Sequence, residues 1–295
     1  HMDIPGGMMF AKAAAFAANT TGPAGVGRGV VTGRHHARVS GAPEVFGELP
    51  ITCLAEEIET EGEGRLRALI TVAGNPVLSS PNGARLSRAL ERLDFMVSMD
   101  IYLNETTRHA DVILPGVSPL EDLHYDVAFP QLSWRNHARY SPPVFERAAD
   151  QPEEWQTLLK LAAIVQGQAQ GQGAAADPDA LDDAQFAEDA RRLFGEHADA
   201  VIAASAPFKG PQRALDVALR AGPYGDRFGR KPDGLNLAKV MASNATGGID
   251  LGELAPRIPE LLRTPSGKVE LAPPMLLADM ARAWADLARP KDELV

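Results

Sequence analysis

The residues of this 295-residue sequence best suited to binding a ligand follow two apolar runs. Gly74-Asn75 comes directly after the first run, and Met99-Asp100 closes the second. Glycine lets the backbone approach a ligand closely, and asparagine offers both donor and acceptor atoms. Aspartate can accept from paired N–H donors, such as those on the Watson–Crick edge of guanine. The pattern indicates base recognition, while helix capping or turn formation is the alternative role for such residues.

The elements that must position these residues form a βαβ unit. The apolar runs 67–73 and 95–99 are typical of buried parallel strands. Between them, Ser79-Ser80-Pro81-Asn82 predicts a helix start, and leucines and alanines follow at helical spacing. A third strand is predicted at 111–114. Because ligands bind outside the carboxyl ends of parallel strands, both residue pairs are expected at one edge of this sheet.

The whole pattern predicts an α/β fold, with a parallel-sheet, Rossmann-like three-layer domain and a largely helical second half. We expect three parts: residues 1–50 as a glycine-rich basic arm and linker, with a loop at 21–29; residues 51–150 as the α/β domain; and residues 151–295 as a mainly helical portion. The helical portion should contain helices near 152–162, 179–195, 211–221 and 276–288, and a turn with a short strand within 264–271.

Composition narrows the class of function. Lysine and arginine total 29 against 39 acidic residues, a net charge of −10, which argues against a general nucleic-acid binder but allows a single nucleotide cofactor. No run approaches the ~18 apolar residues of a membrane span. The single cysteine, Cys53, cannot form an intrachain disulfide, a zinc ribbon or a four-thiolate iron–sulfur cluster. Its apolar neighbours favour a buried packing role over a nucleophile.

Other kinds of site have weaker support. The sequence has neither GxGxxG nor GxxxxGK[ST], which disfavours a conventional NAD site or a P-loop. His109, Asp111 and His124 lack the spacing of a metal site, so we predict no metal ligands. Asp111 is interpreted as a cap at the start of a strand and His109 as a partly buried hydrogen-bonding residue.

Several motifs, in this order and spacing, resemble the molybdopterin-dependent oxidoreductases, the family of formate dehydrogenases, periplasmic nitrate reductases and DMSO reductases. They are residues 68–76, 93–102 and 104–115, the pair Leu120-Glu121, and residues 264–271, the last resembling the stretch before the C-terminal cofactor-binding domain. Pro5-Gly6-Gly7 is similar to a loop of the preceding domain. Each motif is short, but five in the correct order make the resemblance specific.

The resemblance implies a bis(molybdopterin guanine dinucleotide) cofactor carrying molybdenum or tungsten. In that family the third domain is an α/β layer that helps to hold one guanine dinucleotide. The positions that match guanosine contacts are Gly74, Asn75, Met99 and Asp100, and those that match further cofactor-proximal sites are Thr106, Asp122 and Glu153. The family places a basic residue where this chain has Asp122, so the chain departs from the pattern there.

The resemblance also implies a central, domain III-like fragment of such an enzyme. The family's iron–sulfur cysteines, its metal-ligand domain and its C-terminal domain have no counterpart here, so the cluster would belong to a missing N-terminal part. We expect the isolated chain to fold, to carry no molybdenum and to show no turnover. Its partners would be the remaining domains of the parent chain and the guanine dinucleotide. Sparse cysteine favours the cytoplasm, with an exported parent as the alternative. A free-standing nucleotide-binding α/β module without redox chemistry is the alternative function.

Overall fold

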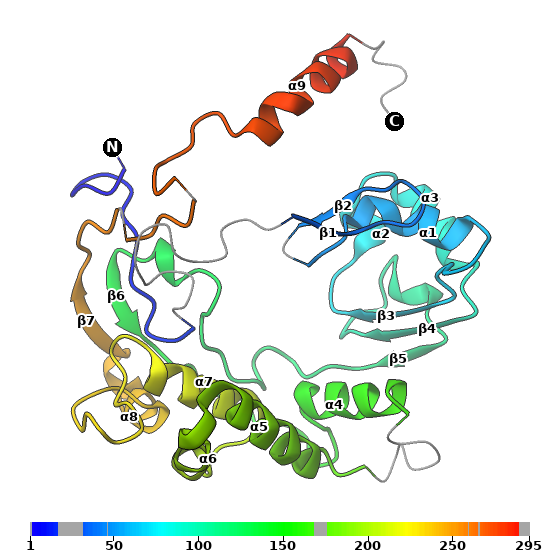
Figure 1. Cartoon of the computed structure of the whole chain (residues 1–295). Coiled ribbons are helices and arrows are strands. Elements are labelled where there is room, and N and C mark those ends of the chain that lie inside the picture. The colour runs from blue at the N-terminus through cyan, green and yellow to red at the C-terminus, as the bar shows by residue number, and fades with distance from the viewer. Residues whose placement is uncertain are drawn as a thin grey trace. The chain divides into compact units, whose positions relative to one another are not determined.

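A computed structural model describes residues 2–16, 32–45, 47–167, 176–258, 260–264 and 266–288 (Figure 1). The loop predicted at 21–29 lies outside these residues. The chain divides into two compact units, and each is assembled from two separate segments. Unit 1 comprises residues 1–24 and 117–261, and unit 2 comprises residues 25–116 and 262–295.

Unit 2 is built around a three-stranded parallel sheet. Its elements are β1 (Thr32–His36), β2 (Pro43–Val45), η2 (Ile51–Cys53), α1 (Leu54–Glu59), β3 (Ala68–Val72), α2 (Pro76–Ser79), α3 (Gly83–Leu90), β4 (Phe95–Met99), η3 (Thr107–His109), β5 (Val112–Leu114) and α9 (Pro274–Leu287). The order β3-β4-β5, with both pairings parallel, confirms the predicted α/β class and the βαβ unit. Strands β1 and β2 form a separate antiparallel pair.

The core of unit 2 lies between the sheet and helices α1 and α3, as Figure 1 shows. Ile58 on α1, Leu86 on α3 and Met96 on β4 are each 3% exposed or less. Burying a side chain of this size contributes roughly 1.5–3 kcal/mol. Cys53 is buried and free, 3.5 Å from the hydroxyl of Ser40, as expected for a packing residue. The packing of α1 and α3 on one face of the sheet therefore stabilises the strands whose ends carry Asn75 and Asp100.

Two sequence predictions for unit 2 need correction. The strand 67–73 was expected to be buried, but Ile70 and Val72 are 43% and 50% exposed, because β3 is an edge strand of the described sheet. The helix expected to start near Ser79 begins instead at Gly83. Asn82, in the left-handed conformation, is its N-cap and accepts a hydrogen bond from the backbone N–H of Arg85. The residues that precede this point form the short helix α2, which ends at Ser79.

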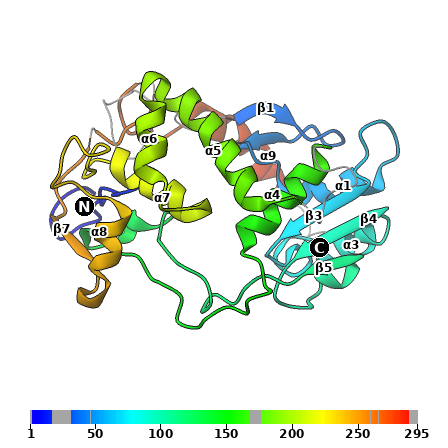
Figure 2. The ribbon, with the colours of Figure 1, turned by 90° about the horizontal axis from the view of Figure 1, so that it is seen from below.

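Unit 1 combines a small antiparallel sheet with a set of helices. Its elements are η4 (Pro130–Leu132), β6 (Arg135–Ala138), α4 (Glu154–Val165), α5 (Pro178–Phe194), η5 (Gly195–His197), α6 (Ala198–Ser205), α7 (Gly210–Ala221), α8 (Leu237–Ala242), η6 (Asn244–Thr246) and β7 (Ile249–Glu253). Figure 2 shows the helices α4, α5, α6 and α7, which pack against one another. Strands β6 and β7 pair antiparallel.

The core of unit 1 gathers residues that are far apart in the sequence. Its buried members lie in or next to α7, α8 and β6 and in the N-terminal segment: Ala14, Ala15, Ala138, Tyr140, Leu215, Leu219, Leu235, Leu237 and Val240. The N-terminal segment is also held by Asp3, whose Oδ2 accepts from the backbone N–H of Arg257 at 2.6 Å. Packing of distant segments, not local periodicity, therefore defines this unit.

The helices of unit 1 and α9 mostly follow the sequence prediction. The predicted helices near 152–162, 179–195, 211–221 and 276–288 correspond to α4, α5, α7 and α9. Helices α6 and α8 were not predicted, because the alanine-rich α6 has no polar period and α8 is only six residues long. No described helix is long and apolar enough to cross a membrane.

The turn expected within 264–271 is present, but the described residues of that range form no strand. The hydroxyl of Thr264 donates to the carbonyl of Lys268, and the N–H of Gly267 donates to the carbonyl of Thr264. These local bonds close a turn. A strand needs a neighbouring strand to accept and donate its backbone hydrogen bonds. These residues instead form some of their backbone hydrogen bonds within the turn.

Candidate functional site

The end of strand β3 turns through an unusual backbone conformation. Ala73 and Gly74 both have positive φ, at 54° and 78°. Positive φ is uncommon for alanine, and such residues concentrate at functional sites. The N–H of Ala73 donates to the carbonyl of Met99 at 2.8 Å, which ties this turn to the end of β4. A Cβ at Gly74 would meet no atom within 4 Å, so the backbone is open to an approaching ligand.

Asn75 is held by two residues of the loop that follows β4. Its Oδ1 accepts a hydrogen bond from the hydroxyl of Thr106 at 2.7 Å, and its Nδ2 donates to Glu105 at 2.5 Å. The Thr106 hydroxyl also accepts from the backbone N–H of Val77 at 3.0 Å. Thr106 is fully buried. The threonine therefore fixes the orientation of Asn75 and does not itself face solvent.

Glu105 adds a negative charge to this edge of the sheet. The hydrogen bond from Asn75 is the main reason that the pKa of this exposed carboxyl is lowered, and Arg108 lowers it further. Glu105 was not among the predicted site residues. It lies between Asn104 and Thr106 in one of the motifs that carry the family resemblance, and that position was the available signal.

Asp100, at the end of β4, is also held by its own loop. Its Oδ1 accepts from the backbone N–H of Tyr102 at 2.9 Å, and its Oδ2 accepts from Nδ2 of Asn104 at 3.2 Å. Asn104 in turn accepts from the backbone N–H groups of Thr106 and Thr107, both at 2.9 Å. Sequence reasoning missed Asn104, which links the aspartate to the start of η3.

Five predicted residues thus meet in unit 2, and we call them the strand-end site: Gly74, Asn75, Met99, Asp100 and Thr106. The side chain of Met99 is buried, so this residue contributes its backbone to the site. Asp122 and Glu153 belong to unit 1. There they line a cavity of about 710 Å³ together with Tyr125, Glu154 and Trp155.

Glu153 has a clear structural role in unit 1. It is the N-cap residue of α4, with a capping box to Gln156. Its carboxylate accepts from Nε1 of Trp155 at 2.6 Å and pairs with Arg147 at 3.2 Å. The helix predicted to start at Pro152 therefore starts after Glu153. Asp122 accepts the backbone N–H of Leu123 at 2.7 Å, its one hydrogen bond among the described residues.

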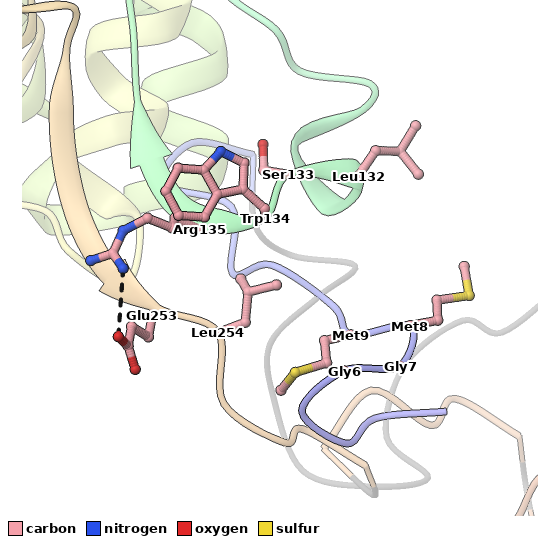
Figure 3. A pocket seen from close by; sticks show the side chains of 10 residues that line it. All are labelled: Gly6, Gly7, Met8, Met9, Leu132, Ser133, Trp134, Arg135, Glu253 and Leu254. Atoms are coloured by element: carbon pink, nitrogen blue, oxygen red, sulfur yellow. Dashed lines mark ion pairs between the residues drawn. The ribbon is translucent and has the colours of Figure 1, made fainter. Parts of the chain in front are cut away.

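A second cavity of unit 1, of about 540 Å³, includes the Gly6-Gly7 turn singled out in the sequence (Figure 3). Its other wall carries Trp134, which is 83% exposed. The guanidinium of Arg135 lies 5.5 Å from the Trp134 ring centroid and pairs with Glu253 across 3.7 Å, the dashed contact in Figure 3. Arg135 also pairs with Asp250, so its charge is already balanced.

The residues considered as metal ligands have other partners. His109 lies 2.9 Å from the hydroxyl of Ser87, and burial is the main reason that its pKa is lowered. Asp111 accepts the backbone N–H of Met96 at 2.7 Å, as a strand-start cap does. Among the described residues, no three His, Cys, Asp or Glu side chains are grouped so that they could hold a metal ion.

Comparison with known proteins identifies the family to which part of this chain belongs. Residues 5–147 match the family model for molybdopterin oxidoreductases, a range that includes the strand-end site. This part of the chain belongs to the molybdopterin oxidoreductase family. The family resemblance found in the sequence is thereby confirmed, and a molybdopterin cofactor is what membership implies.

The relatives of this molybdopterin oxidoreductase segment are much longer proteins. The assimilatory nitrate reductase catalytic subunit of Bacillus subtilis (strain 168) is 43% identical over 67 residues, which is 23% of this chain and 9% of that protein. The F420-dependent formate dehydrogenase subunit alpha of Methanocaldococcus jannaschii is 39% identical over 63 residues, or 21% of this chain and 9% of that protein. A nitrate reductase of Symbiobacterium thermophilum is 42% identical over 61 residues, or 21% and 8%. The matched segments therefore span about a tenth of these relatives, and the chain fits a fragment of such an enzyme.

Proposed function

We propose that the strand-end site binds the guanosine end of a molybdopterin guanine dinucleotide. The observation that carries the proposal is the position of Asn75 and Asp100, which follow the carboxyl ends of the neighbouring parallel strands β3 and β4. Each side chain is held by hydrogen bonds from the loop after β4. Held side chains lose little further freedom on binding, which favours affinity.

The chemistry of Asp100 fits a guanine base. Each of its carboxylate oxygens accepts one hydrogen bond within the protein, from Tyr102 or Asn104. An ionised carboxylate has about four lone-pair sites, so each oxygen retains capacity for one more donor. The N1–H and N2–H groups of guanine are two parallel donors. No atom lies within 4 Å of a Cβ built at Gly74, so a nucleoside could approach the backbone there closely.

The charge of the site favours the nucleoside over the phosphates. Asp100 and Glu105 both present carboxylates at this edge, and the pKa of Glu105 is lowered, so it is ionised at neutral pH. Two negative charges oppose a pyrophosphate but accept hydrogen bonds from a base or from ribose hydroxyls. We therefore assign the guanosine part, and not the pyrophosphate, to the strand-end site.

The role of the chain follows from that assignment. The cofactor, when bound, supplies two-electron redox chemistry at its metal, and a protein contributes binding and orientation. In our proposal Asp100, Asn75 and Gly74 hold one end of the dinucleotide, and Thr106 keeps Asn75 in place. We propose that the metal ligand and any iron–sulfur cluster belong to further domains of a larger oxidoreductase, and that the chain alone carries no molybdenum and has no turnover.

Calorimetry with nucleoside diphosphates tests the site. We expect GDP to bind, ADP to bind at least about tenfold more weakly, and IDP to fall between them, because inosine lacks the 2-amino group. Asp100→Asn should weaken GDP binding by about tenfold or more, because an amide replaces one acceptor oxygen by an NH2 group that opposes one of the two N–H donors of guanine. Asp94→Asn is the matched control, since Asp94 lies at the opposite end of β4 and pairs with Arg67. Equal affinity for GDP and ADP, or GDP binding unchanged in Asp100→Asn, would contradict the proposal.

A free-standing nucleotide-binding module is the second candidate. The whole strand-end site lies within residues 74–106 of unit 2, so nucleotide binding does not need other domains. The mass of the native polypeptide distinguishes the oxidoreductase fragment from the free-standing module. A native protein far above 31.5 kDa that contains molybdenum supports the oxidoreductase fragment. A native protein of 31.5 kDa that binds GDP without metal supports the module.

A further inference from the structure

The larger cavity of unit 1 is a pocket that the strand-end site does not use. It measures about 710 Å³ and is enclosed by the N-terminal segment, the loop 122–127 and the first turns of α4 and α7. Its polar side chains include the carboxylates of Asp122, Glu153 and Glu154 and the imidazole of His124, and no lysine or arginine lines it among the described residues. A pocket of this size is in the range that holds small organic ligands.

Aromatic rings form much of its wall. Phe16, Tyr125 and Trp155 all line the cavity. The orientation of Trp155 is fixed from two sides: its indole N–H donates to Glu153 at 2.6 Å, and its ring packs against Gly210, where a Cβ would lie only 2.6 Å from the ring. A fixed aromatic face is a good surface for alkyl groups and for cations, because the ring face carries negative potential.

Two carboxylates in this cavity have no positive partner among the described residues. Glu153 is paired with Arg147, but neither Asp122 nor Glu154 forms an ion pair with any described residue. Burial raises the pKa of Glu154, and the charge of Asp122 raises it further. In the part of the chain that the structure describes, two neighbouring acids thus lie near apolar walls without an ion-pair partner, which costs free energy unless a ligand supplies the charge.

Other ligand classes fit this lining less well. An anion would face three carboxylates, and His124 is the one basic side chain among the described residues that line the cavity. A bare metal ion needs three or more converging ligands, and the described residues contain no such group. An alkylated ammonium ion combines a positive charge with an apolar surface and matches both parts of the wall. We propose that this cavity binds an alkylammonium cation, with Asp122 and Glu154 opposite the charge and the rings of Trp155 and Tyr125 against the alkyl groups.

Choline and dimethylbutanol, its neutral carbon isostere, are suitable probes for the complete chain. Titration is followed by calorimetry and by tryptophan fluorescence at constant ionic strength. We expect choline to bind at least about tenfold more tightly than dimethylbutanol, since only choline carries the charge. Equal affinity of the two probes, or no saturation by choline, would overturn the proposal.

Substitutions locate the binding. Glu154→Gln and Asp122→Asn should each weaken choline binding several-fold, and about tenfold or more together, with little change in melting temperature. Glu196→Gln is the control, because Glu196 is an acid of the same unit whose side chain is 89% exposed. Choline affinity that is unchanged in the double variant would place the cation elsewhere and refute the assignment. Because the cavity and the strand-end site share no residue, either proposal can fail without the other.

Discussion

The hydroxyl of Thr106 donates to Oδ1 of Asn75 across 2.7 Å, joining the turn after β3 to the loop after β4. Thirty-one positions separate the two residues in the chain. The same hydroxyl accepts from the N–H of Val77 at 3.0 Å. One buried oxygen therefore connects both strand ends and the start of α2.

Removal of this hydroxyl should weaken unit 2. In Thr106→Val, the N–H of Val77 and Oδ1 of Asn75 lose a partner at a fully buried position. We expect a loss of about 1–3 kcal/mol in the free energy of unfolding, measured by urea denaturation. Thr106→Ser keeps the hydroxyl and should lose clearly less. Equal losses in the two variants would show that the methyl group, not the hydrogen bond, matters.

Substitution of Asn75 by aspartate should disturb the same network. The new carboxylate would face Glu105 at the position where the amide now donates across 2.5 Å. Like charges at this distance repel, so Asn75→Asp should lower stability and GDP affinity. Adding Glu105→Gln removes the repulsion and should restore part of the loss. A double-mutant cycle of unfolding free energies checks this coupling, and strictly additive effects would argue against it.

The contact of Trp155 with Gly210 predicts a sharp response to a single methyl group. Gly210 has φ +49°, and a Cβ there would lie 2.6 Å from the indole ring. Gly210→Ala should lower the free energy of unfolding by about 1–3 kcal/mol and change tryptophan fluorescence, since the ring must move. Gly229→Ala is the control, because Gly229 also has positive φ, at +87°, but no atom lies within 4 Å of a Cβ there. The difference in unfolding free energy between the two variants measures the steric clash of the added methyl group with Trp155. Similar tryptophan fluorescence in both variants would contradict a displacement of the ring.

Glu44 should make stability depend on acidic pH. Burial alone would raise its pKa, but hydrogen bonds from Arg34 and Gly47 outweigh burial and lower the pKa from 4.5 to about 2. The carboxylate therefore binds protons less readily in the folded chain than in the unfolded chain. Its stabilising contribution is complete above pH 4.5 and is lost as the pH falls toward 2.

The measurement is urea denaturation of the wild type and of Glu44→Gln at several pH values between 7 and 2. The difference in unfolding free energy between the two proteins should be largest at neutral pH and shrink below pH 4.5. A difference that stays constant over this range would mean that the charge of Glu44 contributes nothing.

The amino-acid sequence by itself determined the local elements and the first residues of the site. The branched apolar runs ending at Gly74 and Asp100 predicted β3 and β4, and the leucine spacing between them predicted α3 except for its start. These signals are local, because strand and helix periods are readable within ten residues or so. The carboxyl-end rule then placed Asn75 and Asp100 at one edge, as found.

Only the tertiary structure decided which residues act together. The bonds from Asn75 to Glu105 and Thr106 join positions about thirty apart, and no periodic pattern encodes such pairs. Both units are assembled from two separate segments, and no local pattern in the sequence encodes which segments join. Glu153 acquires its contacts with Arg147 and Trp155 from the folding of its own loop and helix. Burial and hydrogen bonding depend on the three-dimensional neighbours of a side chain, and those neighbours exist only once the chain has folded.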